Sequence, residues 1–534
     1  MSKIKKSLPI ILILLFSLVL RIPLLNSSFW LDEAAQALEI IRPTSQQLEL
    51  TKDFQPPLLH LILHFAFLIF NSKAEWVLRL IGALIPGLIT IWATYKIGEK
   101  IVSKKVGLTA ALLLSTNSLH IFYSQELRPY SLPAMFATLS WLTLLKFQIP
   151  SAKFQANHKY PISNIQNFTI HHLLFTILTS LGLYSSYLYP FLILSQLVYV
   201  LLLNRKLFKS FVLSTSFSVL CFLPWLPMFL QQLKTGTSWQ VNIPGWASVV
   251  GTPQLKALPL VFGKFIFGVL DLQLNLFFLV ASLLIIGLLA FQAFKLFKQK
   301  KFSIIHSPLS IILIWFFIPL ITSWLISFVV PVLQPKRVLY LLPAFYLAIA
   351  YLCLGKQTSK KESLSLAPSL SPALAQVTPI TLMTLMTLMT LNIYSTYRYF
   401  TDSKLQRENW SGLYAQISQQ FNPSNTIVVF AFDEPFAPWT WYNQAQFAST
   451  TTYSLNTSEL DEQDVITVLF PITDYKNVLI FDYLRDLTDT DDKVLSAVQT
   501  YGFTEVRALD GKQIGFVRVY NRFSELNPNN CSLQ

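Results

Sequence analysis

Long apolar runs recur over the first three quarters of the chain, and short polar, lysine-rich segments separate them. Most of these runs measure about 17 to 23 residues, the length at which a helix crosses the hydrocarbon core of a bilayer. The pattern therefore predicts a polytopic α-helical membrane protein with about eleven spans. We expect the spans at residues 7–25, 77–97, 107–123, 131–147, 170–186, 189–203, 210–230, 274–294, 308–330, 338–354 and 378–395.

Lysines at the ends of the apolar runs predict how the spans are oriented. Lys3, Lys5 and Lys6 precede the first run, and basic residues stay on the cytoplasmic side, so the first span leads outward. A second lysine cluster follows the run 77–97. A span at 57–70 would place that cluster outside, so we expect residues 57–70 to form an interfacial helix on the outer surface. The N-terminus is then cytoplasmic, and the part of the chain after the last span is extracytoplasmic.

After residue 399 the composition changes to that of a water-soluble domain. Short apolar runs at 426–432 and 478–481 are typical of buried strands, and the segment 410–421 has the pattern of a helix. We therefore expect a small α/β domain outside the membrane. The predicted division is a membrane domain at 1–399, with candidate active-site loops at 26–76 and 124–130, and an extracytoplasmic domain at 400–534.

The net charge of +14 does not indicate a nucleic-acid partner. Residues 1–399 carry 32 Lys and Arg against 10 Asp and Glu, whereas residues 400–534 carry 9 against 17. The basic excess therefore belongs to short loops between spans, where it orients the protein in the membrane. Three cysteines, two of them inside apolar runs, predict neither a disulfide framework nor a cysteine-based metal site.

Acidic residues are rare in the membrane part, yet five of its ten carboxylates crowd between residues 29 and 56. They are Asp32, Glu33, Glu39, Glu49 and Asp53. A chain this apolar can omit acids almost everywhere, so the cluster indicates a site where charge is used. Asp32 and Glu33 stand where the first span leaves the bilayer, a suitable place for a catalytic base. Alternatively, these two acids only stabilise the first turn of a helix.

Four segments fall on the same outer side under this topology. They are FWLDEAAQ (29–36), DFQPPLLH (53–60), YSQELRPYSL (123–132) and QPKRVLYLLP (334–343). Together they offer acids, arginines, a lysine and tyrosines at one boundary between water and lipid. This composition suits transfer from an anionic lipid carrier, because a carboxylate can deprotonate an acceptor hydroxyl while guanidinium groups hold the leaving phosphate.

The same four segments resemble motifs of the family-39-type membrane glycosyltransferases of the GT-C fold, relatives of protein O-mannosyltransferases and lipid A aminoarabinose transferases. The matching features are DE after the first span, PPL, SQE-x-R-x-Y-S-L and R-x-x-Y-L-L-P, in this order along residues 1–354. The segment RENWSG (407–412) also resembles one that opens the outer domain of bacterial members.

The resemblance implies a hexosyl or pentosyl transferase that moves a sugar from a polyprenyl-phosphate donor to a hydroxyl outside the membrane. Asp32 matches the general base of the family and Glu33 its acidic neighbour, while Arg128 and Arg337 match positions that bind the donor phosphate. The expected substrate-binding residues are Asp53, Glu126, Arg128, Tyr130, Lys336, Arg337 and Tyr340. As an alternative, Arg128, Lys336 and Arg337 anchor the ends of spans at the lipid headgroups.

Two departures from the family pattern bear on a metal ion. Gln55 stands where members often carry His, and YSSY (184–187) replaces a segment that contains another His. Some relatives bind a divalent metal with acids and histidines of this site, so the cofactor stays open and we assign no metal ligand. His60 and His64 share a helix face, but no third ligand is evident, which favours structural roles.

Two other functions compete with the enzyme. A transporter of lipid-linked sugars should carry polar groups in the middle of its spans, yet these spans are nearly free of ionisable residues. A non-catalytic scaffold that binds the lipid carrier stays open because of Gln55 and Ser186. The lysine-rich loops are typical of a bacterial inner membrane protein. Neither the sugar, the acceptor (a protein, a lipid or a polysaccharide) nor the oligomeric state follows from the sequence.

Overall fold

The computed structural model describes residues 2–50, 53–147, 162–242, 254–273, 275–298, 307–355, 378–431, 437–451, 461–489 and 491–522. The chain divides into two compact units, each built from three stretches of sequence. The first unit consists of Met1–Leu25, Asp53–Leu230 and Gly251–Leu405, and the second of Asn26–Lys52, Gln231–Val250 and Gln406–Gln534. Residues 26–52, which we expected as a loop of the membrane domain, are thus grouped with the C-terminal part of the chain.

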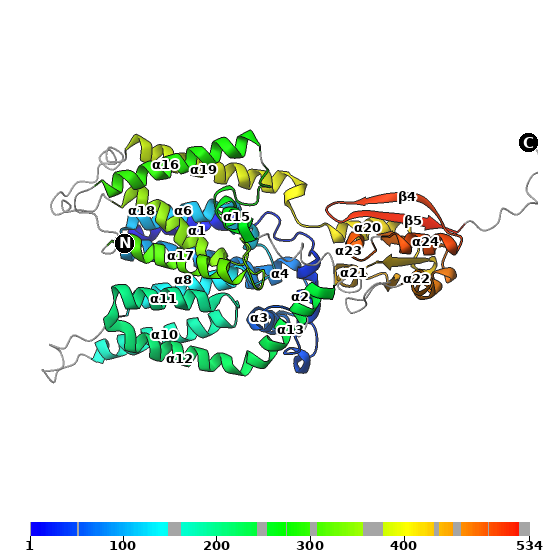
Figure 1. Cartoon of the computed structure of the whole chain (residues 1–534), viewed down its shortest axis with the longest axis horizontal. Helices are drawn as coiled ribbons and strands as arrows, with labels where there is room; N and C mark the ends of the chain where they lie inside the picture. Colours follow the sequence, from blue (N-terminus) through cyan, green and yellow to red (C-terminus); the bar gives the residue numbers. More distant parts are fainter. Residues whose placement is uncertain are drawn as a thin grey trace, which may run out of the picture. The chain divides into compact units, whose positions relative to one another are not determined.

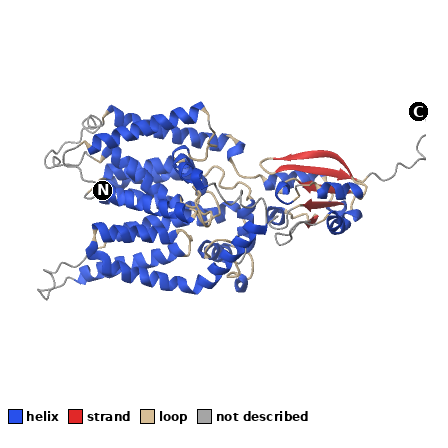
Figure 2. Ribbon diagram, viewed as in Figure 1, coloured by secondary structure: helices blue, strands red, loops and turns tan. Residues whose placement is uncertain are grey.

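The first unit is made of helices (Figures 1 and 2). Its helices are α1 (Ser2–Val19), α3 (Leu58–Phe70), α4 (Glu75–Arg79), α5 (Ile85–Ile101), α6 (Lys104–Thr116), α7 (Ser118–Tyr123), α8 (Ser131–Leu144), α10 (Ile162–Leu183), α11 (Tyr189–Leu203), α12 (Phe208–Phe222), α15 (Gln254–Phe267), α16 (Leu276–Phe297), α17 (Pro308–Ile326), α18 (Leu342–Leu354) and α19 (Pro379–Thr401). Helix α13 (Leu226–Asn242) runs from the first unit into a stretch of the second.

Several of these helices have the length and composition of membrane spans. Among the described residues, four are long and apolar enough: Glu75–Ile101, Arg205–Thr237, Leu276–Phe297 and Pro308–Ile326. Six shorter apolar helices are Ser7–Val19, Leu58–Phe70, Ser131–Leu144, Ile170–Leu183, Tyr189–Leu203 and Leu339–Leu354. The helical membrane class is therefore supported, while the count of eleven spans stays a prediction.

Helix α16 shows how these helices meet their surroundings. Its residues Leu276, Leu279, Val280 and Leu283 are exposed, and the helix packs on α18 and α19, with α19 beside it in Figure 1. An exposed apolar surface of this extent is unfavourable in water and natural against lipid tails. The apolar pattern that predicted a span at 274–294 thus corresponds to a helix with an exposed apolar surface, as a membrane span requires.

The predicted span 107–123 is interrupted at Asn117, which separates α6 from α7. Asn117 has an extended backbone, and its side chain caps α7 by accepting a hydrogen bond from the amide of His120 at 3.0 Å. The same side chain donates to the hydroxyl of Tyr346 (2.8 Å) and to the carbonyl oxygen of Phe265 (3.1 Å). A buried polar residue therefore ties α7 to α15 and α18, and α7 leads directly into the segment 124–130.

Two glycines let α5 and α6 approach each other closely. A Cβ atom on Gly98 would lie 2.6 Å from the Cα of Gly107, and one on Gly107 would overlap the carbonyl oxygen of Tyr95. Because backbone atoms cannot move aside as a side chain does, Gly107→Ala should lower the free energy of unfolding by about 1–3 kcal/mol. The measurement is the melting temperature of the purified protein in detergent.

Gly287→Ala on α16 is the matched control, because a Cβ there would meet no atom within 4 Å. We expect its melting temperature to equal that of the wild type or to exceed it slightly, since alanine favours a helix. Equal melting temperatures for the Gly107 and Gly287 variants would contradict the close packing of α5 on α6.

The C-terminal part of the second unit contains a five-stranded sheet (Figure 2). Its strands are β1 (Thr426–Phe430), β2 (Ala448–Thr451), β3 (Asn477–Phe481), β4 (Thr504–Gly511) and β5 (Gly515–Asn521), in the order β2-β1-β3-β5-β4. The first three strands are parallel, while β5 runs antiparallel to β3 and β4. The helices are α20 (Trp410–Gln420), α21 (Ala437–Tyr442), α22 (Glu462–Leu469), α23 (Arg485–Thr488) and α24 (Lys493–Thr500). The predicted strands and helix correspond to β1, β3 and α20.

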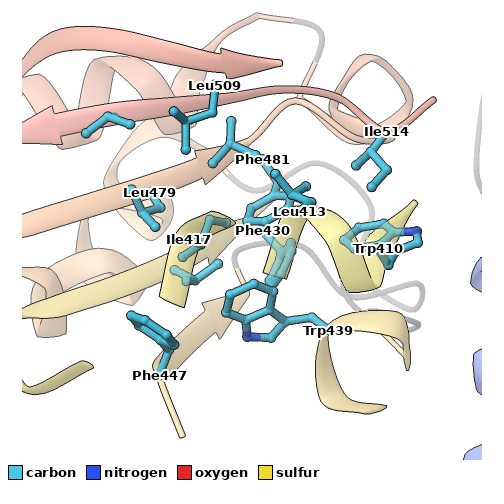
Figure 3. Packing of buried hydrophobic residues seen from close by; sticks show 13 residues of the cluster. Trp410, Leu413, Ile417, Phe430, Trp439, Phe447, Leu479, Phe481, Leu509 and Ile514 are labelled. Carbon is cyan, nitrogen blue, oxygen red and sulfur yellow. The ribbon is translucent and has the colours of Figure 1, made fainter. Parts of the chain in front are cut away.

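Alternation along β1 and β3 gives this sheet a core on each face. Val428 and Phe430 of β1 join one cluster, and Ile427 and Val429 join the other, because successive side chains of a strand point to opposite faces. Figure 3 shows the first cluster, in which the ring of Trp410 stacks on that of Phe481 with centroids 5.8 Å apart. Trp410 is thereby fixed in the core, and so is the start of α20.

Candidate functional site

The acids at the end of the first span begin a helix of the second unit. This helix, α2 (Leu31–Ile40), follows an extended Trp30 and carries Asp32 and Glu33 in its first turn, where acids interact favourably with the helix dipole. Neighbouring residues of a helix point about 100° apart. As a result Glu33 is fully buried, whereas Asp32 is only half-buried and reaches the surface of the unit.

Glu33 is paired with an arginine that lies 374 positions later in the sequence. The Nε of Arg407 is 3.6 Å from Oε2 of Glu33, and the exposed fractions of the two side chains are 3% and 0%. Removing one partner of such a buried pair is strongly destabilising, because the other charge stays behind in a dry environment. The pair therefore joins the first turn of α2 to the segment that precedes α20.

Glu408 makes a second set of contacts to the same region. Its Oε2 accepts hydrogen bonds from the amide of Leu31 (3.4 Å) and from Nε1 of Trp410 (2.6 Å). Its Oε1 accepts one from the hydroxyl of Tyr483 at 2.9 Å. Burial raises the pKa of Glu408, the three hydrogen bonds oppose that rise, and the negative charge of Asp32 adds to it. The negative charge of Asp32 thus acts on the carboxyl of Glu408.

The raised pKa of Glu408 predicts a pH dependence of stability. A carboxyl with a raised pKa in the folded state contributes stability below its unfolded pKa and loses it as the pH rises through the folded pKa. Gln in this position cannot ionise. The melting temperature of Glu408→Gln relative to wild type should therefore rise as the pH increases from about 4 to 8. If the difference in melting temperature between Glu408→Gln and wild type does not change with pH over this range, the raised pKa of Glu408 is contradicted.

The backbone before α2 is held by three further contacts in the second unit. Ser28 Oγ accepts a hydrogen bond from the amide of Ser411 at 3.0 Å, and the amide of Phe29 donates to the hydroxyl of Tyr442 at 2.8 Å. The ring of Phe29 lies 5.7 Å from that of Trp441, centroid to centroid. Helix α2 itself packs on α21, as Figure 1 shows.

In the first unit, three of the four motif segments come together. Nη2 of Arg128 lies 3.8 Å from Oδ1 of Asp53, and their side chains are 14% and 12% exposed. Nζ of Lys336 lies 5.7 Å from the ring centroid of Tyr130, a cation–π contact. The segment 123–132 thus contacts the segment 53–60 through Arg128 and the segment 334–343 through Tyr130.

The segment that carries Arg128 is rigidly supported. Nε2 of Gln125 donates to the carbonyl oxygens of Arg21 (2.9 Å) and Pro23, and its Oε1 accepts from the hydroxyl of Tyr399 at 3.0 Å. A tight turn follows, in which the amide of Tyr130 donates to the carbonyl of Arg128 at 2.8 Å. These contacts fix the backbone of the segment that carries Arg128.

The other expected substrate-binding residues have different surroundings. Glu126 and Tyr340 are buried inside the first unit. Arg337 is half-buried, and its Nη1 donates to the carbonyl of Pro331 at 3.1 Å. Their roles in binding stay predictions, with Arg337 better placed to meet a ligand than the two buried residues.

Sequence reasoning missed an aromatic pair beside Asp53. Nε1 of Trp225 donates to the hydroxyl of Tyr187 at 2.9 Å, and the ring of Phe229 lies 4.7 Å from that of Tyr187. Burial raises the pKa of Tyr187, and the charge of Asp53 raises it further. This tyrosine belongs to YSSY (184–187), the segment that departs from the family pattern.

Metal-binding residues do not cluster in the part of the chain that the structure describes. There, no three His, Cys, Asp or Glu side chains gather closely enough to hold an ion. His60 and His64 are both buried on one face of α3.

The chain shares its fold with several solved structures. A family model described as dolichyl-phosphate-mannose-protein mannosyltransferase matches residues 54–230. The crystal structure of ArnT from Cupriavidus metallidurans bound to undecaprenyl phosphate superposes with a TM-score of 0.56 at 12% identity, over 97% of this chain and 99% of that one. The chain has the fold of the GT-C glycosyltransferases. This likeness confirms the resemblance expected from the motifs.

Two further structures share the GT-C fold with this chain. ArnT from the same organism in the apo state has a TM-score of 0.54 at 12% identity, over 97% of this chain and 98% of that one. The apo oligosaccharyltransferase of Archaeoglobus fulgidus has a TM-score of 0.51 at 14% identity, over 99% of this chain and 76% of that one. No curated protein sequence matches the chain.

Proposed function

We propose that this protein is a glycosyltransferase that moves a sugar from a polyprenyl-phosphate donor to a hydroxyl group of an extracytoplasmic acceptor. The observation that carries the proposal is the meeting of three motif segments around Arg128, Asp53 and Lys336 within a GT-C fold. These segments carry two cations, Arg128 and Lys336, which can receive the phosphate of a lipid carrier. ArnT, which shares the fold, has been crystallised with undecaprenyl phosphate.

In the proposed reaction, Asp32 accepts the proton of the acceptor hydroxyl as its oxygen attacks the anomeric carbon of the sugar. The bond between that carbon and the phosphate oxygen breaks, and polyprenyl phosphate leaves with the electron pair. Arg128 and Arg337 stabilise the charge that develops on the leaving phosphate. Attack from the face opposite the leaving group inverts the anomeric configuration. Glu33 keeps α2 in place through Arg407.

The proposal includes a location. The helices of the first unit lie in a bacterial inner membrane with the N-terminus in the cytoplasm, and the sheet of the second unit lies outside. The positive-inside rule and the lysines after residue 95 support this orientation.

Sugar transfer by the purified full-length protein in lipid vesicles tests the proposal. A panel of polyprenyl-phosphate hexoses and pentoses is offered with peptide, lipid and polysaccharide acceptors, and released polyprenyl phosphate is measured. Release that requires an acceptor supports the transferase. Movement of the intact donor across the bilayer without release supports a transporter. Tight binding of polyprenyl phosphate with neither release nor movement supports a scaffold.

A further inference from the structure

The start of α2 is held by residues from the C-terminal part of the second unit. We infer that Arg407 and Glu408 are positioning residues that hold the first turn of α2, so that Asp32 is aimed at the acceptor hydroxyl. This inference rests on the proposed function, because it concerns the base of that reaction. It assigns the segment 407–411 to the active site although none of its side chains is required to touch the substrate.

The first argument is that Asp32 stands between two anchored neighbours. On one side, the amide of Leu31 donates to Glu408, and on the other the carboxylate of Glu33 faces Arg407 at 3.6 Å. Asp32 itself is half-buried and reaches the surface of the unit. A residue whose neighbours are both fixed has few directions open to its own side chain, which is how a supporting shell orients a catalytic group.

The second argument is that the anchors are themselves immobile. Glu408 accepts from Trp410 and Tyr483, and the indole of Trp410 stacks on Phe481 in the core shown in Figure 3. The ring of Tyr483 also lies edge-on to that of Trp410, with centroids 5.2 Å apart. The core of the sheet therefore fixes the position of Glu408. Glu408 in turn holds the start of α2 through the amide of Leu31.

The third argument is the number of independent contacts on so short a stretch. Within residues 28–33, the side chain of Ser28, the amides of Phe29 and Leu31, and the carboxylate of Glu33 are each held by a residue between 407 and 442. Stabilising α2 alone would not require contacts to the backbone ahead of it. Contacts on both sides of the helix start fix the direction of its first turn, where Asp32 lies.

Arg407→Gln, Arg407→Lys and the control Arg518→Gln test the inference in the full-length protein. Arg518 belongs to the same sheet, and its ion pairs are with Asp482 and Glu505. Displacing a reacting group by about 1 Å can cost about 10²-fold in rate. We expect Arg407→Gln to lower kcat by about 10²-fold while KM for the donor changes less than about twofold. Arg407→Lys should recover part of the loss, because it keeps the charge without the planar fork.

Amide hydrogen exchange of residues 29–40 provides the readout that does not depend on activity. We expect faster exchange of this stretch in Arg407→Gln and wild-type exchange in Arg518→Gln, with both variants melting as folded proteins. Glu408→Gln, which keeps the shape of the side chain, should speed exchange at the same residues. Its kcat should fall while KM for the donor is unchanged.

Each opposite result overturns the inference. A folded Arg407→Gln with wild-type kcat, or one that raises only KM, would show that the arginine does not position the base. Loss of kcat with unchanged exchange at residues 29–40 would show that it acts in another way. If the wild type transfers no sugar, the proposed function fails. The exchange data then still decide whether Arg407 holds α2: faster exchange supports this, and unchanged exchange rejects it.

Discussion

Asp32→Asn is expected to lower the rate of sugar transfer by about 10²–10⁴-fold, the usual contribution of a general base. Asn has nearly the same shape as Asp but cannot take the proton from the acceptor hydroxyl. Because Asp32 is half-buried at the start of α2, the substitution should leave the melting temperature close to that of the wild type. The measurement is the release of polyprenyl phosphate in the presence of an acceptor.

Asp461→Asn, at the start of α22 in the same unit, is a matched control. Asp461 is an exposed acid that caps a helix by accepting from the amide of Asp464 at 2.7 Å, so its substitution also neutralises an acid at a helix start. Its transfer rate should equal that of the wild type. Equal rates for Asp32→Asn and wild type would remove Asp32 from the mechanism and direct attention to Asp53.

Arg128→Gln is expected to weaken binding of polyprenyl phosphate by about 30- to 10³-fold, corresponding to about 2–4 kcal/mol for a lost charge-assisted contact. The substitution also leaves Asp53 without the guanidinium that lies 3.8 Å away, so a carboxylate would face the incoming phosphate. The double variant Arg128→Gln/Asp53→Asn should therefore bind more tightly than Arg128→Gln alone. The measurement is the dissociation constant for polyprenyl phosphate in detergent.

The matched control is Arg205→Gln in the same unit. Arg205 is exposed, and its Nε donates to the carbonyl of Leu201 at 2.8 Å. Its affinity for polyprenyl phosphate should not change. Wild-type affinity in a folded Arg128→Gln would favour the alternative that Arg128 only anchors the end of a helix.

Hydropathy predicted the helical class of the first unit and two strands of the sheet, because burial and membrane insertion leave a local signature in the sequence. Many of the apolar runs correspond to helices of the first unit, and the short apolar runs at 426–432 and 478–481 correspond to β1 and β3. Even the break in the span 107–123 has a local cause, since Asn117 prefers to cap a helix rather than continue one.

The contacts between the residues of the candidate site were harder to predict than the residues themselves. The four motif segments predicted Asp32, Asp53, Arg128 and Lys336 as site residues. They did not predict the pair of Glu33 with Arg407, because the sequence around one of these residues contains no information about the other. A pattern of polar and apolar positions specifies which face of a helix is buried, and not against which distant residue. Tyr187 was overlooked for the same reason, because its relation to Asp53 exists only in three dimensions.

The second unit is assembled from three separate stretches of chain, which has a consequence for how the protein matures. Residues 26–52 are synthesised near the start, and Gln232, whose Nε2 donates to the carbonyl of Leu50 at 2.6 Å, follows about 180 residues later. Arg407 and Glu408 follow later still. During translation the carboxylate of Glu33 must stay hydrated until the last quarter of the chain arrives, since burying it unpaired would be costly. We therefore expect the start of α2 to become ordered only after residues 407 and 408 have been synthesised.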